Sequence, residues 1–106
     1  MVPLRRITQP TLDVLAVLVE ATITGTELHG WVIMKAVGRS GPTVYGVLDR
    51  LEDHGWVEAR WDDDVEPGRP RRRYYRLTAD SLPAARTLVS ARDPARRAIR
   101  LRPGTA

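Results

Sequence analysis

The side chains best suited to chemistry in this sequence lie in one short stretch, GRPRRRYYRLT, at residues 68–78. Five arginines and two tyrosines are found within it. Guanidinium groups form strong, geometrically specific hydrogen bonds with phosphate oxygens, and tyrosine hydroxyls are additional donors. The stretch therefore suggests contact with a phosphate-bearing polyanion, and the surrounding elements must show how such a partner would be held.

The distribution of charge supports a polyanion partner at one surface. Residues 1–68 carry six basic and 11 acidic residues, a net charge of −5, whereas residues 69–106 carry 11 basic and two acidic residues, a net charge of +9. A basic segment attached to an acidic body is typical of proteins that bind polyanions. A coding bias toward arginine is the alternative reading, because 16 of the 17 basic residues are arginine.

Length and composition exclude several classes of protein. The 106 residues, 42% of them hydrophobic, fit one domain with a modest core. The sequence has no cysteine, which excludes disulfides and thiolate sites and favours a cytoplasmic protein. We read no signal peptide, and the longest apolar run is too short to span a membrane. His29 and His54 lack supporting metal ligands, and no catalytic arrangement or cofactor motif is found, so we expect neither an enzyme nor a cofactor.

Hydrophobic periodicity predicts three helices in the first half of the chain. The first opens at Gln9–Pro10, and the second runs from the N-cap Thr26 to Val37. A short turn leads to a third helix over residues 42–54, whose apolar side chains follow the i, i+3, i+4, i+7 spacing. Those side chains are Val44, Val47, Leu48 and Leu51.

The period then changes to that of strands. Residues 56–61 and 71–77 alternate and are predicted to form a hairpin with a long tip, with Trp56, Trp61 and Tyr75 in the core beneath it. A last helix follows Thr78, and its onset should be delayed by Pro83.

This order predicts a mainly α fold with a small β-hairpin, the winged helix-turn-helix (α-α-α-β-β-α). We expect a DNA-binding domain at 1–78, a C-terminal helix at 79–92 that serves dimerisation, and a flexible basic tail at 93–106.

Several segments together carry a family likeness. Residues 27–31 read ELHGW, 40–45 read SGPTVY, and 48–57 read LDRLEDHGWV, followed by the arginine stretch. In this order and spacing they resemble the PadR family of winged-helix transcriptional regulators, over roughly residues 8–92. The resemblance implies a dimeric repressor of palindromic operators, with the third helix in the major groove and the hairpin reaching the backbone or minor groove.

The sequence departs from that family in the third helix, at the hairpin tip and in the C-terminal helix. Gly46 stands where family members commonly have proline, and Asp49 stands where a neutral or basic residue is usual. The tip of the hairpin is acidic at residues 62–66, and the C-terminal helix is short and interrupted by proline. Asp49 could accept a hydrogen bond from a cytosine amino group, pair with an arginine, or weaken binding.

The candidate DNA contacts lie at the start of the third helix, just before it, and in the wing. The first turns of a recognition helix approach base edges, and its free N–H groups suit a phosphate. For Lys35 and Arg39 the alternative role is to complement the helix dipole, and for Tyr45 it is to pack against the wing. The candidates are Lys35, Arg39, Ser40, Thr43, Tyr45, Gly46, Arg50, Arg69, Arg71, Arg72 and Arg73.

Two functions remain open at this stage. The first is a sequence-specific regulator that binds double-stranded DNA as a homodimer, with a small-molecule effector left open and no membrane partner. The second is a winged-helix module that holds another protein, as antirepressors and assembly factors do. The acidic hairpin tip, Asp49 and Asp53 favour the second reading, and the arginine stretch favours the first.

Overall fold

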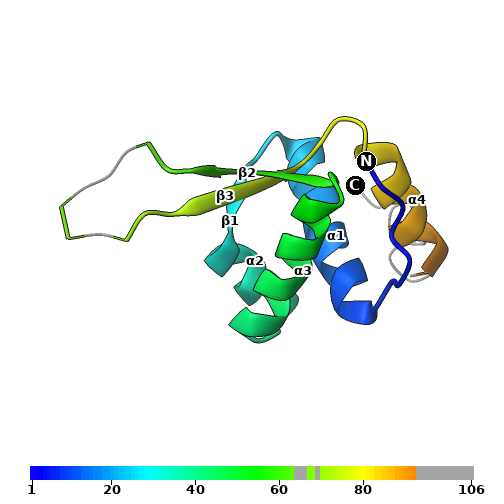
Figure 1. Cartoon of the computed structure of the whole chain (residues 1–106), viewed down its shortest axis with the longest axis horizontal. Coiled ribbons are helices and arrows are strands. Elements are labelled where there is room, and N and C mark those ends of the chain that lie inside the picture. Colours follow the sequence, from blue (N-terminus) through cyan, green and yellow to red (C-terminus); the bar gives the residue numbers. More distant parts are fainter. Residues whose placement is uncertain (64–66, 69, 93–106) are drawn as a thin grey trace, which may run out of the picture.

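The computed structural model describes residues 1–63, 67–68 and 70–92. A mainly helical winged helix-turn-helix is confirmed, with one strand more than the sequence predicted (Figure 1). The tail at 93–106 lies outside the described residues, and within them no helix is long and apolar enough to cross a membrane. The elements are α1 (Gln9–Thr24), β1 (Leu28–His29), α2 (Gly30–Val37), α3 (Gly41–Asp53), β2 (Val57–Trp61), β3 (Arg73–Leu77) and α4 (Leu82–Arg92).

Helix α1 begins where the sequence predicts and is the central helix of the domain. The Thr8 side chain caps it by accepting from the Thr11 amide, and Pro10 lies in its first turn. Gly25 ends it in the left-handed region at φ 72°. Both threonines of the last turn are helical, and their hydroxyls donate to carbonyls of the preceding turn, as Thr22 does to Leu18 at 2.8 Å.

The segment before α2 corrects the predicted helix boundary. Helix α2 begins at Gly30, not near Thr26, because Leu28 and His29 are extended and form strand β1. These two residues pair antiparallel with Tyr75 and Tyr74 of β3. Strand β3 thereby becomes the central strand of a three-stranded sheet in the order β1-β3-β2, with hydrogen-bonding partners on both edges.

Strands β2 and β3 form the wing, which projects well beyond the helical body (Figure 1). Their pairing runs from Val57–Leu77 near the body to Trp61–Arg73 further out. Each strand starts slightly later than predicted. Trp56 precedes β2, and its carbonyl accepts from the Thr78 amide at 3.0 Å.

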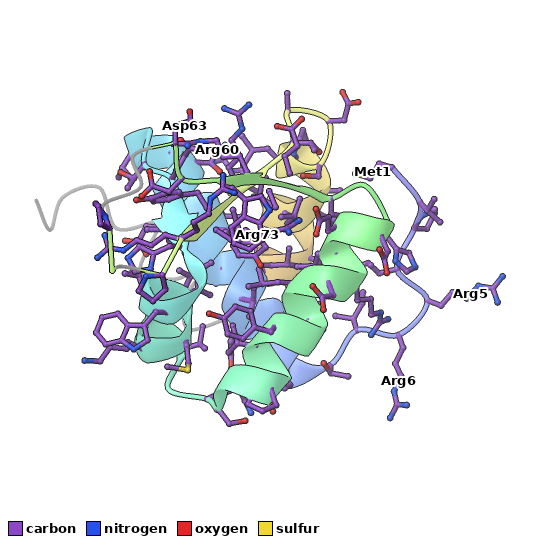
Figure 2. All side chains as sticks on the ribbon, turned by 60° about the vertical axis from the view of Figure 1, so that its left-hand side comes forward. Met1, Arg5, Arg6, Arg60, Asp63 and Arg73 are labelled. Carbon is purple, nitrogen blue, oxygen red and sulfur yellow. The ribbon has the colours of Figure 1, made fainter. Side chains whose placement is uncertain are left out.

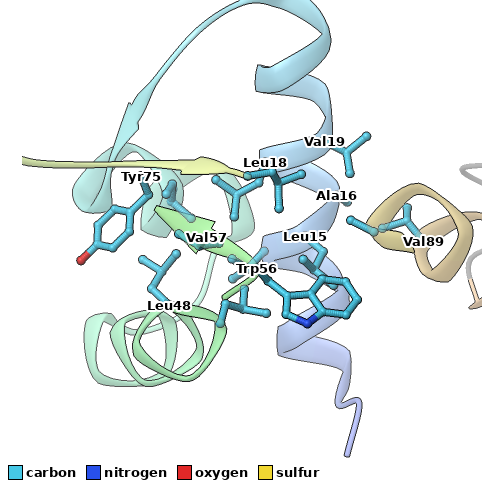
Figure 3. Packing of buried hydrophobic residues seen from close by; sticks show 14 of the residues in the cluster. Leu15, Ala16, Leu18, Val19, Leu48, Trp56, Val57, Tyr75 and Val89 are labelled. Atoms are coloured by element: carbon cyan, nitrogen blue, oxygen red, sulfur yellow. The ribbon is translucent and has the colours of Figure 1, made fainter. Parts of the chain in front are cut away.

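A single core joins all four helices to the body end of the sheet (Figure 3). In α3, Val44, Leu48 and Leu51 of the predicted stripe are at most 1% exposed, whereas its fourth member, Val47, is only partly buried. Trp56 and Tyr75 are buried as predicted, but Trp61 is 48% exposed and lies outside the core. Trp61 ends β2 out on the projecting wing, so the body cannot cover its ring.

Helix α4 shows the predicted delay, beginning at Leu82 with Pro83 in its first turn. Thr78 does not cap the helix directly; its side chain accepts from the amide of Ser81 at 3.2 Å. The fully buried Ser81 hydroxyl lies 2.7 Å from the Trp56 carbonyl, which ties the start of α4 to the start of the wing. Helix α4 packs on α1, with Val89 facing that helix (Figure 3).

Candidate nucleic-acid interface

The outer face of α3 is free of core contacts and carries small and hydrogen-bonding side chains. Ser40 is the N-cap residue, and its hydroxyl donates to Thr43 Oγ1 at 3.0 Å. Thr43, Tyr45 and Gly46 are all exposed, and a Cβ added at Gly46 would meet nothing within 4 Å. The first two turns of α3 therefore present hydroxyl groups around an open strip of backbone.

The Tyr45 ring lies close against the start of α2. A Cβ built on Gly30 would lie 2.6 Å from the Tyr45 hydroxyl oxygen, so only glycine leaves room for the ring there. The ring remains 41% exposed. Packing against the wing was the alternative role for Tyr45; its close contact is with the first residue of α2.

A cleft of about 800 Å³ opens between α2, α3 and the base of the wing. The three exposed aromatic rings of the described residues line it, from Trp31, Tyr45 and Trp61. Residues 71–73 form its wing side, and Asp49 and Glu52 form part of its α3 side. The cleft brings one predicted residue of α3, Tyr45, together with the predicted wing arginines at 71–73, although they are more than 20 residues apart in sequence.

The wing arginines differ in their surroundings. Arg71 and Arg72 are exposed, and no described carboxylate pairs with either of them. Arg73 is only half-buried and donates to Glu52 Oε2 of α3 at 2.8 Å (Figure 2). Arg69 lies outside the described residues.

Two other predicted contacts are engaged inside the molecule. The Arg39 side chain forms an ion pair with Asp13 of α1 at 2.9 Å, which joins the turn before α3 to the first helix. Arg50 donates to the backbone carbonyl of Arg6, in the segment before α1. Lys35 is exposed, with its ammonium 4.4 Å from the centroid of the Trp31 ring.

Sequence reasoning missed an aromatic cluster at the mouth of the cleft. The His29 ring stacks on Trp31 at a centroid distance of 6.4 Å and meets Tyr74 edge-on at 5.8 Å. Burial, with a smaller contribution from the nearby Arg72 charge, lowers the pKa of His29 below its usual 6.5. The only signal in the sequence was the run of aromatic residues around Gly30, and the pairing of β1 with β3 was needed to bring Tyr74 to it.

Two further side chains at the sheet, Glu27 and Tyr75, have shifted pKa values. The hydrogen bonds from Arg60 lower the pKa of Glu27, and this pair ties the start of β1 to β2. Burial raises the pKa of the Tyr75 hydroxyl. Among the described residues no three His, Asp or Glu side chains gather as a metal site requires.

Comparison with known proteins decides the family. The model of the transcriptional regulator PadR-like family matches residues 14–81, from α1 through the wing. The chain belongs to this family. As a PadR-like protein it is a DNA-binding transcriptional regulator and not an enzyme. No curated protein gives a significant match to the sequence.

Solved structures share the fold. The DNA complex of MepR from Staphylococcus aureus is 25% identical, with a TM-score of 0.67, and 88% of this chain matches 63% of MepR. MepR in a DNA-binding conformation matches equally well, over 64% of its length. AF1382 from Archaeoglobus fulgidus matches 82% of this chain over 88% of its own length, at 18% identity and a TM-score of 0.65. The PadR-like chain thus spans under two thirds of MepR and most of AF1382.

Proposed function

We propose that this PadR-like protein is a repressor that recognises a specific double-stranded DNA site, with α3 in the major groove and the wing along the neighbouring backbone. The observation that supports the proposal is the shared cleft, because Tyr45 of α3 and the exposed wing residues Arg71 and Arg72 line it together. A helix of this size fits the major groove, and its first turns approach base edges.

Each part of the interface has its own task in this proposal. Thr43 and Tyr45 donate to bases or phosphates, and Gly46 lets the α3 backbone come close to the DNA. The amides at the start of α3, after Ser40, face a phosphate. Arg71 and Arg72 neutralise phosphates along the wing.

Lys35 adds a further backbone contact, and Arg69 is proposed as an arm toward the minor groove. Arg39 and Arg50 serve the DNA indirectly, because their ion pair and hydrogen bond within the chain hold the turn and helix in place.

We further propose that the protein acts as a homodimer, which presents two copies of α3 to the two halves of a palindromic site. An apolar groove of about 430 Å³ lies between the N-terminal segment and α4. Leu4 and Leu88 are partly buried at this groove, and a second copy would cover them. The role of a small-molecule effector stays open within this proposal.

The decisive experiment titrates the protein into labelled DNA from its own promoter, with scrambled competitor DNA and several salt concentrations. We expect a complex that survives the competitor and weakens steeply with salt, at two protein chains per site. Equal binding to scrambled DNA, or no binding at all, would refute sequence-specific DNA recognition by this protein.

A protein-binding module is the second candidate, favoured by the acidity of α3. Asp49 and Asp53 are exposed, and no described basic side chain pairs with either one. These charges repel phosphates, so a basic protein surface would fit them better. A stable protein complex in the absence of any DNA binding would favour this function over the first.

A further inference from the structure

Arg73 links the recognition helix α3 to the base of the wing. Its Nη2 donates to Glu52 Oε2 at 2.8 Å, and both side chains are 34% exposed. The guanidinium also lies 5.2 Å from the centroid of the Trp61 ring and 6.0 Å from that of Tyr75. One side chain therefore contacts α3, β2 and its own strand β3.

The position of the Arg73–Glu52 pair allows it to affect the direction of the wing. Trp61 and Arg73 are the outermost paired residues of β2 and β3, and one further backbone hydrogen bond follows, from the Asp62 amide to the Arg72 carbonyl at 2.7 Å. Beyond this point the wing projects away from the helices (Figure 1). A small change in direction at Arg73 is therefore enlarged toward the wing tip.

Arg73 is a poor candidate for a phosphate contact, in contrast to its neighbours. Its charge is already paired with Glu52, and its Nε is buried without a partner among the described residues. A phosphate that displaced Glu52 would leave that carboxylate unpaired beside the DNA, which costs binding free energy. No carboxylate of the described residues pairs with Arg71 or Arg72, and the Arg71 guanidinium has the Trp61 ring near it, 5.6 Å from the ring centroid.

We propose that Glu52 and Arg73 are positioning residues, which fix the angle between the wing and α3 so that both reach the DNA together. This inference rests on the proposed function and assigns a role to two residues that touch no DNA. Trp61 adds a cation–π contact to the arrangement, with its ring centroid 5.2 Å from the Arg73 guanidinium.

The first test is a double-mutant cycle on operator DNA with Glu52→Gln, Arg73→Gln and both together. We expect each single variant to lose operator affinity by roughly tenfold, the scale of coupling within one ion-pair network, and the double variant to lose no more than either. The salt dependence should stay as in the unchanged protein. Arg71→Gln serves as the contrast. Losing one phosphate contact reduces the slope of log affinity against log salt concentration by about 0.9.

A control variant shows whether the loss of affinity is specific to the Arg73–Glu52 pair. Glu58→Gln breaks an ion pair of the same chemistry on the same hairpin, Glu58 with Arg76 at 3.0 Å, and should leave affinity unchanged. The proposal is overturned if Arg73→Gln lowers the salt slope as Arg71→Gln does, while Glu52→Gln binds DNA more tightly. That outcome would make Arg73 a phosphate contact and Glu52 only a repelling charge.

The second test needs no DNA and separates this inference from the proposed function. We expect hydrogen exchange at the Asp62 amide to quicken in Glu52→Gln and Arg73→Gln but not in Glu58→Gln, with α1 amides unchanged. If the two variants exchange faster but the unchanged protein binds no DNA, the proposed function is refuted and the structural link between Arg73 and Glu52 is retained. Normal operator binding with unaltered exchange in all variants would refute the link alone.

Discussion

The Tyr45 ring lies directly against the backbone of Gly30, so that the first residue of α2 contacts a side chain of α3. A Cβ at Gly30 would overlap the ring, with 2.6 Å to its hydroxyl oxygen. The contact ties the orientation of one proposed DNA donor to a residue 15 positions earlier in the chain. Gly30 thus acts on the interface without facing DNA itself.

Replacing Gly30 with alanine should therefore lower DNA affinity and leave the fold intact. The Tyr45 ring is 41% exposed and can swing outward, so the free energy of unfolding should change by no more than about 1 kcal/mol. Operator affinity should fall to that of Tyr45→Ala, because both variants remove the hydroxyl from its position. Titration calorimetry and urea unfolding would measure the two effects. An operator affinity unchanged by Gly30→Ala would separate Tyr45 from DNA binding.

Gly46→Ala should stabilise the protein while weakening DNA binding. The added methyl group meets nothing within 4 Å, and alanine is favoured over glycine inside a helix by about 0.5–1 kcal/mol. The same methyl group would stand between the α3 backbone and the base edges. Urea unfolding should therefore show higher stability in the variant whose operator affinity is lower. A gain in stability with unaltered affinity would argue that this face of α3 does not touch DNA.

Arg71→Gln and Arg72→Gln should weaken binding to operator and scrambled DNA by similar factors. Both side chains are exposed on the wing, where phosphate contacts carry no sequence information. The plot of log affinity against log salt should lose about 0.9 in slope for each phosphate contact removed. Filter-binding at four salt concentrations would measure it. A variant that instead lost only operator binding would place its arginine at a base edge.

The lowered pKa of His29 predicts a loss of stability in mild acid. The folded state binds the His29 proton more weakly than the unfolded chain does, so protonation favours unfolding. This contribution is absent above the ordinary pKa of 6.5 and destabilises the fold progressively as pH falls from there toward the lowered folded value. The melting temperature should therefore drop less in His29→Gln than in the unchanged protein between pH 7.5 and 5. Parallel pH profiles for the two proteins would contradict the assignment.

The elements that the sequence predicts well are those determined by local patterns. The apolar stripe of α3 and the delay that Pro83 imposes on α4 follow from helical periodicity and from the missing proline N–H. Strand β1 could not be predicted, because two residues have no period of their own and become a strand only by pairing with β3. Its omission also placed the start of α2 too early.

The sequence predicted DNA contacts at the start of α3 and in the wing, and in the folded chain Tyr45 and the wing residues 71–73 line one cleft. The tasks of the individual arginines could not be predicted. The ion pairs of Arg39 with Asp13 and Arg73 with Glu52 join residues 26 and 21 positions apart, so only the folded chain reveals them. Trp61 was placed in the core beneath the wing together with Trp56 and Tyr75, because aromatic side chains usually fill that core; the sequence cannot show where a wing leaves the body, and Trp61 is 48% exposed.

The separation of the two faces of α3 has a consequence for evolution. The buried face, with Val44, Leu48 and Leu51, holds the domain together, whereas on the outer face a Cβ added at Gly46 would meet nothing within 4 Å. Mutations at this position should therefore change which DNA is preferred at almost no cost in folding. A lineage carrying this domain could move to a new operator through single substitutions, without first acquiring a stabilising change elsewhere.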